Sequence, residues 1–227
     1  MIRALFVDLD DTLYAYAPSE QAGREAMRDA VCASTGISAD AFDVKFKASR
    51  ERVKARCDSP SGHSRLLYAA ELAQDLPGAH HLEHVRDWER AYWGAYIAAA
   101  TLRPGAKELL QGFRARGGKV AIVTDLVLEV QLWKLSALDL LSSIDALVAS
   151  EEVGVDKPAL APFLLAAERI GVSAQEGAVI GDSDDKDGGG ARALGVPFFL
   201  VRSTDAGPGD TLPDIARAIE RTNGWTR

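Results

Sequence analysis

Acidic side chains stand where short apolar runs of this sequence end. Four of them follow two such runs, one near the N-terminus and one near residue 180: Asp8, Asp10, Asp182 and Asp187. Carboxylates that crowd together repel one another, and their pKa values rise unless a cation neutralises them. Oxygen ligands without His or Cys favour a hard cation such as Mg²⁺. If these segments meet in space, the residues predict a magnesium site.

Thr124 and Lys157 add the parts of a phosphate site, because Thr124 ends another apolar run and Lys157 lies shortly after a further one. In a strand, Asp8 and Asp10 would point to the same side, since side-chain direction repeats every two residues. One carboxylate could then attack phosphorus and form an aspartyl-phosphate, while the other protonates the leaving oxygen and later activates water. Mg²⁺ and Lys157 would offset the charge of the transferring phosphoryl group.

The elements that must position these residues alternate between strand and helix. Short apolar runs predict strands at 4–7, 120–124, 146–149, 178–180 and 198–201. Helical periodicity predicts helices at 104–116, 127–141, 158–170 and 212–221. This alternation predicts the α/β class, with a mostly parallel, Rossmann-like sheet covered by helices on both faces. Functional groups gather at the carboxyl ends of such strands, which is where the acids fall.

One long stretch interrupts the alternation. It has no convincing strand and is rich in Ala, Glu and Arg, so we expect an α/β core formed by 1–16 and 102–227 and an inserted helical cap at 17–101. Loops are predicted near 59–62, 77–78 and 206–210. Three histidines of the insert, His80, His81 and His84, are interpreted as a solvated helix start rather than a zinc site.

Two patterns within the insert have a structural and a functional interpretation. The aromatic residues that recur at helical spacing are Trp88, Tyr92, Trp93 and Tyr96. They favour internal packing, with an apolar wall over the substrate as the alternative. The basic residues are Lys45, Lys47, Arg50, Arg52, Lys54 and Arg56. They favour a solvated helix face, with contact between Arg50 or Arg56 and an anionic substrate as the alternative.

Taken together, the strand-end segments resemble the haloacid dehalogenase-like (HAD) hydrolase superfamily. Asp8-Leu9-Asp10-Asp11-Thr12-Leu13 matches its first motif, DxDxT followed by an apolar residue. The run 119–124 is similar to the second motif, Lys157-Pro158 to the third, and Gly181-Asp182 with Asp187 to the fourth, GDxxxxD. The resemblance covers about 1–16 and 102–202, and the helical insert is similar to that superfamily's cap.

The resemblance implies a role for each matching residue. Asp8 would be the nucleophile and Asp10 the general acid and base. Mg²⁺ would be held by Asp8, the backbone carbonyl of Asp10 and Asp182, while Asp187 would bind it through water or support Lys157. Thr124 and Lys157 would bind the phosphoryl group. Asp125 departs from the family pattern, where Asn or Ser is commoner, and its role stays open.

Asp10 decides the class of reaction within the family. Members that dehalogenate 2-haloacids lack this second carboxylate and need no metal, whereas an alkoxide leaving phosphorus benefits from a proton donor. The resemblance therefore implies a Mg²⁺-dependent phosphatase that acts on a small phosphorylated metabolite. A sugar phosphomutase is the main alternative. A dehalogenase, a phosphoacceptor signalling receiver domain and a catalytically silent binding protein are weaker ones.

Composition narrows the environment and the partners. The formal net charge of −7 argues against broad binding to nucleic acid or to anionic membranes. The uncharged stretch 91–102 falls short of the roughly 20 residues that a membrane span needs, and acids interrupt the only apolar run near the N-terminus. Two cysteines, Cys32 and Cys57, make no disulfide framework, so we expect a cytoplasmic protein. The sequence carries no sign of an oligomeric state.

Overall fold

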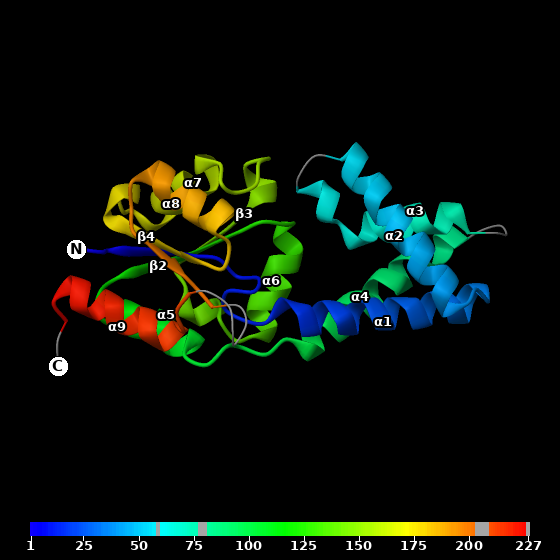
Figure 1. Cartoon of the computed structure of the whole chain (residues 1–227), viewed down its shortest axis with the longest axis horizontal. Coiled ribbons are helices and arrows are strands. Elements are labelled where there is room, and N and C mark those ends of the chain that lie inside the picture. Colours follow the sequence, from blue (N-terminus) through cyan, green and yellow to red (C-terminus); the bar gives the residue numbers. More distant parts are fainter. Residues whose placement is uncertain (58–59, 77–80, 203–208, 226–227) are drawn as a thin grey trace. The chain divides into compact units, whose positions relative to one another are not determined.

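Five parallel strands form one sheet in the order β3-β2-β1-β4-β5 (Figure 1). They are β1 (Ala4–Val7), β2 (Lys119–Thr124), β3 (Ala146–Ala149), β4 (Gly177–Gly181) and β5 (Phe198–Leu200). The computed structural model describes residues 1–57, 60–76, 81–202 and 209–225. His80 and parts of the three predicted loops lie outside the described residues. The predicted parallel α/β sheet is confirmed.

The central strand β1 has a partner on each side. Val7 is in register with Ile122 of β2 and with Ile180 of β4. All four residues of β1 are buried, as expected for an apolar strand that is covered on both faces. The chain extends the sheet first from β1 to β2 and β3 and then returns to the other side of β1 for β4 and β5. Such a reversal creates a crevice at the carboxyl ends of β1 and β4.

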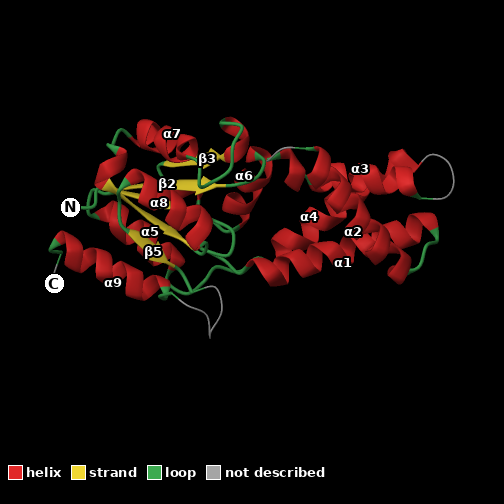
Figure 2. Ribbon diagram, turned by 45° about the horizontal axis from the view of Figure 1, so that its top comes forward, coloured by secondary structure: helices red, strands yellow, loops and turns green. Residues whose placement is uncertain are grey.

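Helices cover both faces of this sheet (Figures 1 and 2). The core contains α5 (Ala106–Ala115), α6 (Leu128–Ala137), α7 (Leu160–Ile170), α8 (Gly189–Leu194) and α9 (Leu212–Asn223). In both views α7 and α8 lie on one face, and α5 and α9 lie on the other. The ring of Phe6 in β1 meets the ring of Phe163 in α7 edge to face, with centroids 6.2 Å apart.

Several helix ends differ from the expected ones by one to four residues, and two of these differences have a cause in the backbone angles. Helix α5 starts at Ala106, because its N-cap Gly105 has φ 83°, a left-handed conformation outside the helix. Helix α6 ends at Ala137 rather than near residue 141, because Asp139 takes φ 52° and stops its propagation. A short 3-10 turn, η3 (Leu141–Ser143), fills the remainder of the predicted helix.

Residues 16–100 form a second compact unit made of helices, whereas 1–15 and 101–227 form the α/β unit. This helical unit contains α1 (Tyr16–Thr35), α2 (Ala39–Arg56), α3 (Arg65–Asp75) and α4 (Val85–Ala99). Serine side chains cap two of these helices: Ser38 accepts from the Ala41 N–H, and Ser64 accepts from the Leu67 N–H. Among the described residues, no helix is both long enough and apolar enough to cross a bilayer.

The aromatic residues of the insert pack inside this helical unit. The four rings are at most 3% exposed: Trp88, Tyr92, Trp93 and Tyr96. Packing is therefore the interpretation that the structure favours for the aromatic residues.

Two residues of the basic run form ion pairs within the helical unit. Arg52 and Arg56 both pair with Glu71, at 2.7 and 2.9 Å.

Candidate active site

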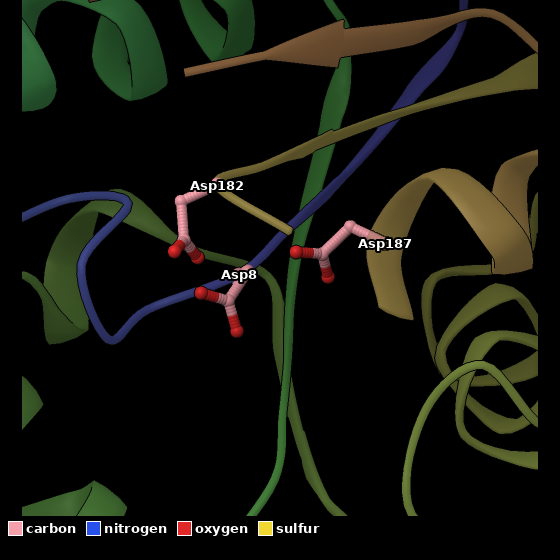
Figure 3. A group of neighbouring side chains, drawn as sticks. All are labelled: Asp8, Asp182 and Asp187. Atoms are coloured by element: carbon pink, nitrogen blue, oxygen red, sulfur yellow. The ribbon is translucent and has the colours of Figure 1, made fainter. Parts of the chain in front are cut away.

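Three carboxylates meet at the carboxyl ends of β1 and β4 (Figure 3). Asp8 follows β1, Asp182 follows β4, and Asp187 lies in a π-helical turn, η6 (Asp184–Gly188). One oxygen from each carboxylate lies within 4.8 Å of the others. The N–H of Asp8 donates to the carbonyl of Ile180 at 2.9 Å, which continues the pairing of the two strands up to the site.

Glycine and serine shape the turn that carries Asp187. A Cβ on Gly181 would overlap the Asp187 carboxylate, so only glycine at the end of β4 leaves room for this side chain. The Ser183 N–H donates to Asp187 Oδ2 at 3.2 Å, and the Ser183 hydroxyl accepts from the Lys186 N–H at 3.2 Å. The acid is therefore fixed by its own loop before any ligand binds.

Lys157 lies between two of the three acids. Its Nζ donates to Asp8 Oδ1 at 2.6 Å, to Asp187 Oδ1 at 2.7 Å and to the Val123 carbonyl at 3.1 Å. These contacts use all three N–H groups of the ammonium. The residue is 5% exposed. One buried cation thus faces three carboxylates, and the group keeps an excess of negative charge.

The pKa values of the acids reflect that excess. Burial raises the pKa of Asp8 to about 8; Lys157 acts in the opposite direction, while the negative charge of Asp187 adds to the rise. Burial and the charges of Asp187 and Asp11 raise the pKa of Asp182 to about 6. Asp8 and Asp187 hold the pKa of Lys157 above its usual range in spite of its burial.

The donor set fits a hard divalent cation. It consists of carboxylate oxygens alone, without His or Cys, and its charge is not balanced by Lys157. The Thr12 hydroxyl lies at hydrogen-bond distance from Asp8 Oδ2 (2.9 Å) and, less closely, from Asp182 Oδ1 (3.3 Å). Thr12 therefore links the two acids that come from different strands.

The side chain of Asp10 has its own set of hydrogen-bond partners. Strand β1 ends at Val7, so both Asp8 and Asp10 lie beyond it and strand alternation does not set their directions. Lys134 Nζ donates to both carboxylate oxygens of Asp10, at 2.6 and 2.9 Å. Gln131 Nε2 donates to Oδ2 at 3.1 Å, and the Tyr14 hydroxyl donates to Oδ1.

These partners decide the charge of Asp10. Burial favours its neutral form, but Lys134, Tyr14 and Gln131 outweigh burial and hold the pKa of Asp10 below its ordinary value of 3.8. The Lys134 side chain is 2% exposed. Sequence reasoning missed Lys134 and Gln131. The available signal was two polar residues three positions apart, which places Gln131 and Lys134 on one face of the helix.

Thr124 is the last residue of β2, and Asp125 follows it into the same crevice. The Thr124 hydroxyl accepts from Gln131 Nε2 at 2.7 Å and donates to the Asp125 carbonyl at 3.2 Å. The Asp125 carboxylate accepts from the Lys157 N–H at 3.0 Å and from Lys186 Nζ at 2.6 Å. Asp125 is thus neutralised by Lys186 and anchors the backbone of Lys157, a contact that the sequence left open.

Known proteins match nearly the whole chain. A family model described as haloacid dehalogenase-like hydrolase matches residues 2–195. A protein of Halopiger xanaduensis named ribulose-1,5-bisphosphate 5-phosphatase is 35% identical over 226 residues, covering 97% of this chain and 93% of that protein. A protein of Methanopyrus kandleri named glyceraldehyde 3-phosphate phosphatase is 32% identical, covering 89% of this chain and 84% of that protein.

A solved structure extends the likeness to the fold. The structure of a 2-haloacid dehalogenase from Pseudomonas syringae pv. Tomato superposes with a TM-score of 0.76, at 21% identity and with 100% of both chains covered. At that identity the likeness concerns the fold alone. Phosphatases and a dehalogenase thus resemble this chain, and the fold does not choose between them.

Proposed function

Because the chain belongs to the haloacid dehalogenase-like hydrolase family, we propose that it hydrolyses small phosphomonoesters through a phosphoryl group carried on Asp8. One observation carries this proposal. Asp8 directly follows the central strand, accepts a hydrogen bond from Lys157 at 2.6 Å, and has a carboxylate oxygen within 4.8 Å of oxygens of Asp182 and Asp187. The relatives at 35% and 32% identity are both named as phosphatases of small phosphorylated metabolites.

In the first half of the proposed reaction, a carboxylate oxygen of Asp8 attacks phosphorus. A bond forms between that oxygen and phosphorus, and the bond from phosphorus to the leaving oxygen breaks. Asp10 gives a proton to that leaving oxygen, which departs as an alcohol. Lys157 and Thr124 hold the transferred phosphoryl group, for which each exchanges one of its present hydrogen-bond partners.

In the second half, water attacks the phosphorus of the aspartyl-phosphate. Asp10 accepts the proton of that water, inorganic phosphate leaves, and the Asp8 carboxylate is restored. The lowered pKa of Asp10 suits this role as a base, because the residue is ionised at neutral pH. For the first half, the proton comes with a substrate that binds as its monoanion, since a phosphate monoester has a second pKa of about 6. The proton that Asp10 takes from water in the second half leaves with the product as dihydrogen phosphate, so Asp10 is again ionised.

Asp8, Asp182 and the backbone carbonyl of Asp10 would hold Mg²⁺, and Asp187 would bind it through water or serve Lys157. When bound, the ion neutralises charge on the phosphoryl oxygens and on the acids. The raised pKa values of Asp8 and Asp182 support this assignment, because both acids lack a sufficient counter-charge. Asp187 already accepts from Lys157 at 2.7 Å, which favours its supporting role.

The helical unit would act as the cap of this enzyme, and a small phosphorylated metabolite would be its partner. The net charge of −7 disfavours nucleic acid and anionic membranes as further partners. The free thiols of Cys32 and Cys57 support a reducing compartment such as the cytoplasm.

The test is Mg²⁺-dependent phosphate release from p-nitrophenyl phosphate and a panel of phosphorylated metabolites. Asp8→Asn should lower kcat by at least about 1000-fold, because the amide is not a nucleophile. The matched control is Asp185→Asn, an exposed residue of the same acidic loop, which should keep full activity. Wild-type turnover in Asp8→Asn would end the assignment.

The same assay separates the alternatives. A phosphomutase would return the phosphoryl group to a sugar instead of releasing phosphate, and a dehalogenase would release halide from a 2-haloacid without metal. Asp10→Asn should slow alkyl phosphates about 100-fold or more and slow aryl phosphates less, since good leaving groups need less protonation. Equal losses on both substrates would argue against a proton donor at Asp10.

A further inference from the structure

A small pocket lies within the helical unit, among side chains from α1, α2, α3 and α4. Its volume is about 40 Å³, and its lining includes Tyr16, Glu20, Arg50, Arg65 and Tyr92. A volume of this size holds a few water molecules or one carboxylate or phosphate group. All of these residues belong to the unit 16–100, so the pocket exists without any contribution from the α/β unit.

Arg65 brings a buried positive charge to the pocket. It is 9% exposed, and its guanidinium lies 5.3 Å from the ring centroids of both Tyr92 and Trp93. Arg65 Nη1 donates to the His63 carbonyl at 2.8 Å, and Nη2 donates to the Tyr16 hydroxyl at 2.9 Å. These two bonds use two of its five N–H groups, and the guanidinium also interacts with the Tyr92 hydroxyl, so at least two N–H groups stay available.

No carboxylate neutralises this cation within the part of the chain that the structure describes. Glu20 lines the pocket, but it does not come within ion-pair distance of Arg65. Burial of a charge without a paired counter-ion is costly, so buried guanidinium groups normally face a carboxylate or a bound anion. The aromatic rings offset part of this cost but supply no hydrogen-bond acceptor for the remaining N–H groups.

The hydroxyl of Tyr92 adds an unused hydrogen-bond donor to the same pocket. This hydroxyl is buried, with the residue 1% exposed, and makes no hydrogen bond of ordinary geometry among the described residues, although it lies close enough to the Arg65 guanidinium to interact with it. Such an interaction uses the hydroxyl oxygen as an acceptor and leaves its O–H free to donate. Burial raises the pKa of Tyr92, so the hydroxyl stays protonated and can donate. A second cation, Arg50, lines the pocket as an exposed side chain. Two arginines and an unused phenol donor thus surround one small volume, against a single acid.

We propose that this pocket binds an oxyanion, a carboxylate or a phosphate group, with Arg65 as the cation and the Tyr92 hydroxyl as a donor. The anion has two possible sources. It is either the non-reacting anionic group of the substrate, in which case this inference builds on the proposed phosphatase activity, or a free anion that binds independently. The first source agrees with the name of the 35% identical relative, whose bisphosphate substrate keeps a second phosphate.

Binding is tested with sulfate as the probe, followed by tryptophan fluorescence because the Trp93 ring adjoins Arg65. Sodium chloride at equal ionic strength is the reference. The wild-type response should saturate, and Arg65→Gln should weaken the apparent affinity by at least about 10-fold, the effect of losing charged hydrogen bonds. Tyr92→Phe should weaken it about 3- to 10-fold.

The matched control is Arg90→Gln, which removes the same charge from a side chain of α4 that is 69% exposed. It should bind sulfate as the wild type does. Tyr92→Phe removes only one oxygen, which makes no hydrogen bond of ordinary geometry among the described residues, so it keeps the test decisive if Arg65→Gln fails to fold. A wild-type response without saturation, or wild-type affinity in Tyr92→Phe and in a folded Arg65→Gln, would overturn the proposal.

The source of the anion is decided by comparing kcat/KM for phosphoglycolate, which carries a second anionic group, with kcat/KM for p-nitrophenyl phosphate, which does not. A substrate site predicts that this ratio falls at least about 10-fold in Arg65→Gln and stays unchanged in Arg90→Gln. An unchanged ratio together with lost sulfate affinity assigns the pocket to a free anion. If the wild type releases phosphate from no ester, the proposed function fails, while the sulfate titration still decides the pocket.

Discussion

Lys134 is the residue that most affects how Asp10 can work. Its buried ammonium contacts both oxygens of Asp10, so it fixes the direction of that carboxylate and keeps it ionised. A general base needs both properties, because it must reach a water molecule and must be deprotonated when it does. Lys134 is therefore a positioning residue that acts through Asp10.

This role predicts a shift in the pH profile. Removal of the cation in Lys134→Met raises the pKa of Asp10, because an opposite charge within about 4 Å had lowered it. The base form is then lost at a higher pH, and the acid limb of kcat should move upward by about one pH unit or more. The measurement is kcat against pH for p-nitrophenyl phosphate.

A control variant and a contradicting outcome test this role of Lys134. Lys134→Arg keeps the positive charge and should keep the acid limb near its wild-type position. A purely structural lysine would lower kcat in Lys134→Met at every pH without moving the limb, and that result would contradict the role.

Leu126 carries backbone strain beside the site. Its φ of 112° lies in a region that side chains other than glycine rarely adopt, and such conformations cost about 1–3 kcal/mol. Leu126→Gly should relieve that cost. Part of the gain is offset because glycine increases the backbone entropy of the unfolded chain, so the free energy of unfolding should rise by about 1 kcal/mol. Urea denaturation measures the difference.

Its neighbour Val127 has φ −81°, which needs no glycine, so Val127→Gly should lower the free energy of unfolding. If both glycine variants destabilise the protein equally, Leu126 stores no strain.

At the scale of residues, the sequence identified the acids because of where they stand. Asp8 and Asp182 directly follow apolar runs, and strand ends in a parallel sheet gather at one edge. Lys134 could not be found in this way, because a lysine within a helix normally faces solvent. Its burial depends on the distance between α6 and the loop after β1, which only the folded chain defines.

Strands proved easier to predict than helix ends at the scale of elements. The run 146–149 matches β3 at both ends, because this partly buried edge strand is apolar throughout and stops at the polar residue Ser150. Helix α6 stopped four residues early, since one left-handed residue, Asp139, ends it and no periodicity reveals that conformation. The pattern of apolar residues thus predicts which residues are buried better than it predicts the backbone angles that end a helix.

The side-chain amide of Asn223 connects the end of helix α9 to the start of the chain. Asn223 at its end accepts from the Ile2 N–H at 2.7 Å and donates to the Ile2 carbonyl at 2.9 Å, and both bonds are buried. Asn223→Ala leaves two buried backbone groups unsatisfied, so the free energy of unfolding should fall by about 2–4 kcal/mol. Chemical denaturation of the two proteins measures this loss.

Thr222→Ala is the matched control, because it truncates the adjacent, exposed side chain, whose hydroxyl bonds only within the helix. It should change the free energy of unfolding by less than about 0.5 kcal/mol. Equal effects of the two substitutions would show that Asn223 makes no special contribution.

At the scale of the whole molecule, metal and pH should act together. In the metal-free protein the pKa values of Asp8 and Asp182, about 8 and about 6, exceed the ordinary value of 3.8. The folded state therefore holds these protons more tightly than the unfolded state. That contribution to stability is complete below about pH 4 and is lost as pH rises through 6 and 8.

Added Mg²⁺ should replace the lost protons. The increase in Tm on adding Mg²⁺ is expected to grow from pH 5 to pH 8, and at 100 times Kd it corresponds to about 2.7 kcal/mol. Thermal unfolding with and without Mg²⁺ at each pH gives this increment, and Asp182→Asn should remove most of it. An increment that is constant or larger at pH 5 would contradict the linkage.

The two-unit organisation also has a consequence for the order in which the protein forms. Strand β1 ends at Val7, but its neighbours β2 and β4 begin only at Lys119 and Gly177. At about 5–20 residues per second, the ribosome needs roughly 6 to 22 s to travel from β1 to β2. The entire helical unit is translated within that interval, and α1, α2, α3 and α4 contact one another. The nascent chain therefore has its second unit ready to fold while the strand bearing the nucleophile still waits, unpaired, for both of its neighbours.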